Sequence, residues 1–159
     1  MQGDTTIGAN ARVNPGNSPG RLTVFGDVAL DGTLLIEVAD LSNFDVFNVV
    51  GDITFSSTTM FEFLFDSTFM PTTMTTLDFL FASSFAGIDL LDTGNFLFTG
   101  LDPRYVASVG FGDNAFRRVG TLSFALSPTA APEPGTVALL LVAIALTSLQ
   151  GGRRRRSAA

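Results

Sequence analysis

The first half of the chain alternates between hydrophobic and polar positions with a period of two residues. From Leu22 to Val38 every second residue is hydrophobic or glycine, and Phe47 to Phe65 repeats the pattern with mostly phenylalanine at the hydrophobic positions. Such alternation places successive side chains on opposite faces of a β-strand. It predicts strands with these inward residues: Leu22, Val24, Val28, Leu30, Leu34, Ile36, Val38, Phe47, Val49, Ile53, Phe55, Phe61, Phe63 and Phe65.

The two stretches resemble each other at an offset of 25 residues. "GDVALDGTLLIEV" begins at Gly26 and "GDITFSSTTMFEF" begins at Gly51. A repeat of this length lies within the range of solenoid coils, so we expect an all-β body that is β-solenoid or β-helix-like. Two similar hairpins in an antiparallel β-sandwich are the alternative. The offset matches these pairs: Gly26 with Gly51, Asp27 with Asp52, Val28 with Ile53, Thr33 with Thr58, and Glu37 with Glu62.

Turn signals precede and follow these strands. "NPGNSPG" (14–20) predicts tight turns. With the alternating strands that follow, residues 13–65 resemble the entry into the β-solenoid repeats of autotransporter-type passenger regions. Later, "TTLDFLFASSF" and "NFLFTGL" predict further strands, while "DPRYVASVGF" and "RRVGTLSFAL", separated by the turn "GFGDNAF", predict a closing hairpin.

The last part of the chain has a different composition. A Pro-rich linker is followed by thirteen residues, Val137 to Leu149, that are apolar except for Thr147 and Ser148. The uncharged run from Gly135 to Gly152 would span about 27 Å as a helix, close to the roughly 30 Å of a bilayer core. We expect a turn-rich N-terminal segment (1–21), a β-rich body (22–126), a linker (127–135), a single transmembrane α-helix (136–152) and an Arg-rich cytoplasmic tail (153–159).

The charges around this helix predict its orientation. Arg153, Arg154, Arg155 and Arg156 follow the helix directly, and no basic residue closely precedes it. The positive-inside rule keeps the arginines in the cytoplasm and places the body across the membrane. Burying four arginines in hydrocarbon instead would cost about 2.5–3.5 kcal/mol each. We expect these arginines to act as a membrane stop.

The C-terminal features together resemble a known sorting signal. Pro132, Glu133 and Pro134, a short apolar helix and a terminal arginine cluster are similar, in this order, to the PEP-CTERM signal of bacterial exported proteins. The resemblance covers residues 131–156. It implies that an exosortase, an integral-membrane enzyme, recognises and cleaves near the motif. It further implies an inner-membrane intermediate that then reaches the cell surface or the extracellular matrix of exopolysaccharide-producing bacteria.

Export of this kind normally begins with a signal peptide. "MQGDTTIGANARVNPG" contains no apolar region of about 7–15 residues, which a signal peptide requires. We therefore expect that the sequence is a fragment of a longer protein or that its start is placed too late.

The composition excludes several classes of activity. The chain has no Cys, His or Lys, so Ser–His–Asp triads, Cys–His pairs, the usual zinc sites and Schiff bases are excluded. Up to residue 131 there are five Arg and fourteen Asp or Glu residues. Such an acidic body would repel a phosphate backbone, so we expect no nucleic-acid partner. We expect no catalytic residues and no cofactor.

The remaining candidate chemistry belongs to carboxylates. In the repeat register, Asp27 would lie over Asp52 and Glu37 over Glu62, about 4.8 Å apart. Such pairs are candidate cation ligands, and their spacing is close to the roughly 5–5.5 Å of retaining glycosidases. A solvated acidic face that keeps a Phe-rich fold soluble is the favoured explanation of these residues. We therefore expect a non-enzymatic structural or interaction role in exopolysaccharide or biofilm, the alternative being a carbohydrate-binding or carbohydrate-active module.

One segment raises the question of self-assembly. "MFEFLF", from Met60 to Phe65, has high β propensity, one charge and no proline, as cross-β segments do. Its regular alternation favours an ordinary core strand instead.

Overall fold

The computed structural model describes residues 2–16, 19–71, 75–114 and 117–128. The chain divides into two units after Ser127, and the first unit is mostly β, as expected. The helical segments in the described residues are two 3₁₀ turns, η1 (Ile88–Leu90) and η2 (Thr93–Asn95). No helix in this part of the chain is both long and apolar enough to cross a membrane. The expected transmembrane helix at 136–152 and tail at 153–159 lie outside the described residues.

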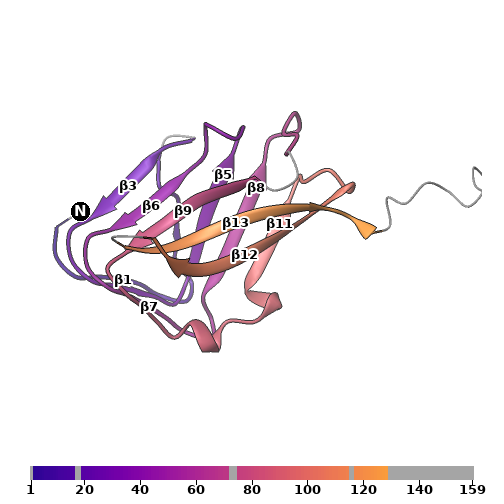
Figure 1. Cartoon of the computed structure of the whole chain (residues 1–159). Helices are drawn as coiled ribbons and strands as arrows, with labels where there is room; N and C mark the ends of the chain where they lie inside the picture. The colour runs from indigo at the N-terminus through magenta and orange to yellow at the C-terminus, as the bar shows by residue number, and fades with distance from the viewer. Residues whose placement is uncertain (1, 17–18, 72–74, 115–116, 129–159) are drawn as a thin grey trace, which may run out of the picture. The chain divides into compact units, whose positions relative to one another are not determined.

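The strands form three sheets (Figure 1). Sheet 1 has the order β1 (Thr5–Ile7), β4 (Val28–Leu30), β7 (Ile53–Phe55), β10 (Phe85–Ala86). Sheet 2 has the order β2 (Arg12–Val13), β5 (Thr33–Val38), β8 (Met60–Phe65), β11 (Phe96–Thr99). Sheet 3 has the order β3 (Arg21–Val24), β6 (Val46–Val49), β9 (Thr76–Ala82), β13 (Arg118–Leu126), β12 (Tyr105–Asp113).

The chain visits the three sheets in the same order several times. We call each visit to sheets 1, 2 and 3 a pass. Every neighbouring pair within sheets 1 and 2 is parallel, as are β3 with β6 and β6 with β9. The repeated segments therefore pair side by side, unlike the hairpins of the antiparallel sandwich alternative.

The expected offset of 25 residues holds in sheet 1 and fails in sheet 2. Val28 is paired with Ile53, as the repeat predicts. In sheet 2, however, Leu35 is paired with Glu62, an offset of 27. The reason is the connection between the two sheets, which has two residues (31–32) in the second pass and four (56–59) in the third. The predicted matches of Thr33 with Thr58 and of Glu37 with Glu62 are therefore wrong.

The inward set predicted from the sequence forms a large part of the core. All of these residues are buried except Leu22, which is half-buried. Residues outside this set complete the core: Ile7, Phe69, Leu77, Phe79, Leu80, Ala82, Leu122 and Phe124. Phenylalanine rings stack between successive passes in sheet 2. Leu34 and Phe96 both pair with Phe61, and the Phe61 and Phe96 ring centroids are 5.4 Å apart. Phe63 stacks on Phe98 in the same way at 5.3 Å.

The predicted closing hairpin is confirmed as β12 and β13. It continues sheet 3 in the antiparallel sense beyond β9, as Figure 1 shows. Phe111 of β12 packs its ring against Phe55, Phe61 and Phe85 at centroid distances of 5.5, 5.9 and 5.6 Å. The hairpin thus covers part of the core at the last pass.

Candidate functional site

The candidate carboxylates Asp27 and Asp52 lie at the corner where the chain enters sheet 1. Asp27 Oδ1 accepts a hydrogen bond from the Asp52 backbone N–H at 2.9 Å. Asp4 Oδ1 accepts one from the Asp27 N–H at 3.1 Å. The carboxylates of Asp4 and Asp27 therefore each join one pass to the next. Hydrogen bonds of this kind give an acceptor to backbone N–H groups that would otherwise lack one at the corner.

The Asp4 step is a third copy of the repeat that the sequence reasoning missed. The dipeptide Gly-Asp precedes each strand of sheet 1 in the first three passes, at 3–4, 26–27 and 51–52. The glycine is needed because the passes approach closely there. A Cβ on Gly51 would lie 2.5 Å from the Gly26 carbonyl oxygen and 2.3 Å from Asp27 Oδ1. The repeated Gly-Asp dipeptide is the sequence signal that could have revealed this third copy.

The other two candidates, Glu37 and Glu62, are not stacked as expected. Glu62 Oε2 forms an ion pair with Arg12 at 2.8 Å, and Glu37 Oε2 accepts a hydrogen bond from Asn14 Nδ2 at 3.3 Å. Within the described residues, no three acidic side chains are grouped so that they could hold a metal ion. The glycosidase-like spacing was expected for both pairs. The two-residue shift in sheet 2 removes it for Glu37 and Glu62, whereas the strands that follow Asp27 and Asp52 keep the expected register.

A second row of polar side chains closes the corner between sheets 2 and 3. In all four passes, an Asx side chain accepts the backbone N–H of the residue two positions later, which is an Asx turn. This row was not predicted from the sequence, because the four residues follow their strands at different distances and the residues after them differ between passes. The four N–O distances are 3.3 Å for Asn14, 2.7 Å for Asp40, 2.8 Å for Asp66 and 2.9 Å for Asp102.

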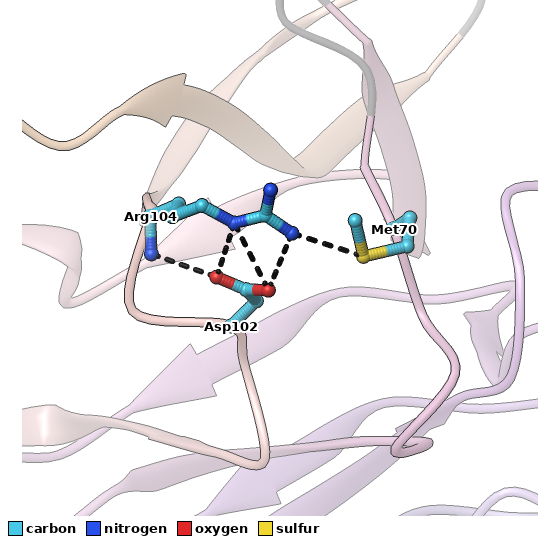
Figure 2. A network of polar contacts seen from close by, with 3 residues as sticks. All are labelled: Met70, Asp102 and Arg104. Atoms are coloured by element: carbon cyan, nitrogen blue, oxygen red, sulfur yellow. Dashed lines mark hydrogen bonds and ion pairs between the residues drawn. The ribbon is translucent and has the colours of Figure 1, made fainter. Parts of the chain in front are cut away.

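In the fourth pass this turn also holds an arginine (Figure 2). Arg104 Nη2 lies 2.8 Å from Asp102 Oδ2, and Arg104 Nε lies 3.0 Å from Asp102 Oδ1. The same Nη2 approaches the Met70 sulfur at 3.7 Å. The hydrogen bonds from the Arg104 side chain and backbone, with its charge, lower the pKa of Asp102 from 3.8 to about 2.

We expect this pair to add to the acid sensitivity of the fold. The unfolded chain takes up the Asp102 proton near pH 3.8 and the folded chain only near pH 2. The contribution of Asp102 to stability is therefore complete above pH 3.8 and is lost as the pH falls through about 2. Asp102→Asn should reduce the slope of unfolding free energy against pH between these values in urea titrations. Arg104→Gln should reproduce part of the change, and an unchanged slope in both variants would contradict the assignment.

The buried carboxylate of Asp45 links its own segment to the segments around Gly20 and Glu37. Its side chain accepts backbone N–H bonds from Gly20 at 2.6 Å and from Glu37 at 2.9 Å. Asp45 has no exposed surface, and burial raises its pKa against the opposing effect of these two bonds. The charge of Glu37 raises it further. Because both bonds run to the backbone, the arrangement is suited to holding the fold rather than to proton transfer with a substrate.

The predicted sorting motif, Pro132 to Pro134, and the arginines Arg153 to Arg156 lie outside the described residues. The carboxylates of Asp4, Asp27, Asp45 and Asp102 accept backbone N–H bonds, and those of Glu37 and Glu62 contact neighbouring side chains of the body. No protein-family model matches the chain, and a search of the curated proteins found no significant match.

Proposed function

We propose that this protein is exported by a bacterium and sorted through its C-terminus by an exosortase. In this proposal the body crosses the inner membrane, and the apolar helix and Arg153–Arg156 hold the chain there. Cleavage near Glu133 then delivers the body to the cell surface or to an exopolysaccharide matrix. The body acts there as a non-enzymatic scaffold.

The architecture of the body supports the scaffold role. We propose that it is a short, three-sided β-solenoid, because strands from successive passes pair in parallel in all three sheets. The corner carboxylates also support the scaffold role, since Asp27 and Asp45 bond to backbone amides. A body whose polar groups stabilise its own corners fits a structural component.

The observation that carries the sorting proposal is the order of segments at the C-terminus. The last strand of the body ends at Leu126, shortly before Pro132. The motif, an apolar run and four arginines then follow without another charged residue between Glu133 and Arg153. Proline at positions 132 and 134 removes two backbone donors around Glu133, which favours an extended, accessible segment.

The test is expression of the full chain behind a signal peptide in a host that carries an exosortase. We expect intact-mass analysis to find that the tail is lost, with a new terminus between Ala131 and Gly135. Glu133→Ala should remain uncut in the membrane fraction, because the residue that the enzyme reads is missing.

Glu62→Ala is the matched control. It makes the same chemical change on the body, where it removes a partly exposed ion pair with Arg12, and it should be processed like the unmodified chain. Processing of Glu133→Ala at the normal rate would refute the sorting proposal.

A further inference from the structure

Strand β12 forms the outer edge of sheet 3. It pairs with β13 along nine residues, and with no other strand in the described part of the chain. In an antiparallel ladder the backbone groups of alternate residues point to opposite sides. Ser127 N–H bonds to the Arg104 carbonyl and Asn114 N–H to the Arg117 carbonyl. The even-numbered residues of β12 therefore face β13, and the odd-numbered residues face the open edge. The N–H of Tyr105 is already bonded to the Asp102 carbonyl at 2.9 Å, so the donors offered at this edge begin at Ala107.

This edge lacks the features that normally prevent strands from joining. Tyr105 to Gly112 contains no charged residue and no proline, and its ladder with β13 has no register shift. The register shift of this sheet lies on the other side of β13, between Gly120 and Thr121. Natural proteins protect exposed edges with charges, prolines, bulges or short strands. A long, regular and uncharged edge is suited to pairing with another strand.

A groove beside the edge offers space for an added strand. The groove has a volume of about 390 Å³ and lies between β11 and β12. Its lining is largely apolar, and the rings of Phe96 and Phe98 are only partly buried there. An added strand would gain backbone hydrogen bonds from β12 and bury apolar side chains in this groove.

The charges at the two ends of β12 favour a second copy of the same strand. Arg104 precedes the strand and Asp113 ends it. Antiparallel pairing of two copies brings the arginine end of each beside the aspartate end of the other, whereas parallel pairing brings like charges together. Each of these residues also has a partner in its own chain, Asp102 and Arg118 respectively.

We propose that two copies of this protein join β12 to β12 in antiparallel orientation, about a two-fold axis at Val109. Sheet 3 then continues from one copy into the other, with Tyr105 of each chain opposite Asp113 of its partner. The contact uses the same surface on both copies, so it closes at a dimer. The proposal does not depend on the sorting signal.

The segment singled out in the sequence for self-assembly cannot form this contact. Met60 to Phe65 is strand β8, which pairs with β5 on one side and β11 on the other. Its backbone groups are therefore used within sheet 2, and association is expected at β12 instead.

Sedimentation velocity of the full chain in non-ionic detergent tests the proposal. We expect the unmodified chain to be a dimer at micromolar concentration. Val109→Pro removes an N–H that faces the open edge and leaves the ladder to β13 intact, so it should weaken dimerisation about tenfold or more. Val109→Thr keeps the N–H and should remain dimeric. A monomeric unmodified chain, or a Val109→Pro variant that is folded by circular dichroism and still dimeric, would overturn the proposal.

Cross-linking gives a second readout that does not rely on a proline variant. The chain has no cysteine, so one introduced thiol is unique. Ser108 and Ser123 are partners across the hairpin, and Ser108 lies on the edge strand. A short bismaleimide should join two copies of Ser108→Cys and leave Ser123→Cys, one strand further from the axis, largely unlinked. Equal cross-linking of the two variants would contradict pairing at β12.

Discussion

Phe61→Ala should destabilise the body by about 3–5 kcal/mol, the usual cost of removing a phenylalanine from a packed core. Phe61 is fully buried, and its ring lies 5.7 Å from Phe55 and 6.1 Å from Phe79 between centroids, in addition to its stack on Phe96. The alanine would leave a cavity lined by aromatic rings from several strands. Urea unfolding followed by far-UV circular dichroism measures the loss, because the chain has no tryptophan.

Phe25→Ala is the matched control for this variant. Phe25 is 56% exposed, and the same substitution there should change the unfolding free energy by only about 0.5 kcal/mol. Similar losses for the two variants would mean that the core is not arranged around Phe61.

Asp45→Ala should cost about 2–4 kcal/mol, because two backbone N–H groups would lose their acceptor inside the protein. Those groups belong to Gly20 and Glu37. The loss should appear in urea unfolding near neutral pH. Asp113→Ala removes an exposed carboxylate paired with Arg118 and should have little effect.

The pH dependence gives an independent check on Asp45. Because its pKa is raised in the folded protein, the folded state holds the proton more tightly than the unfolded state. This contribution to stability is present below about pH 3.8 and is lost as the pH rises through the raised value. Asp45→Asn should abolish that part of the profile. A profile unchanged by Asp45→Asn would contradict a titrating, buried carboxylate.

The inward residues of the core could be predicted from the sequence, but the breaks between strands could not. From Leu22 to Val38 the alternation is continuous, yet the structure divides this stretch into β3, β4 and β5 in three different sheets. The alternation continues around the corners because a residue that points inward at a corner also points toward the interior that the three sheets share. Period-two patterning therefore identifies the face of each residue and not the direction of the chain.

The repeat predicted the relative positions of Asp27 and Asp52 correctly and those of Glu37 and Glu62 incorrectly, because the connections between the sheets differ in length. Asp27 and Asp52 lie directly before strands of equal register, so the repeat placed them correctly next to each other. Glu37 and Glu62 follow a connection whose length differs by two residues between passes. Ser56 to Thr59 and Asp31 to Gly32 are both acceptable turn sequences, so residue type did not reveal the difference.

The row of Asx turns between sheets 2 and 3 could not be predicted from equal spacing in the sequence. Asn14, Asp40, Asp66 and Asp102 follow strands of sheet 2 at different distances, and the residues after them differ. Only the side-chain oxygen and the N–H two positions later are shared. A search based on equal spacing misses such a row, because its members are related by their place at a corner.

The unequal connections between sheets 1 and 2 indicate where this protein tolerates added sequence. The connection grows from two residues in the second pass to four in the third, and the fourth pass fits two 3₁₀ turns into it, while Leu34, Phe61 and Phe96 stay aligned. Ser57 and Thr58 of the four-residue connection are exposed, while Thr59 is buried. Lengthening a surface loop has a small entropic cost. The corner is therefore a natural insertion point for an epitope or a binding peptide to be displayed on the body.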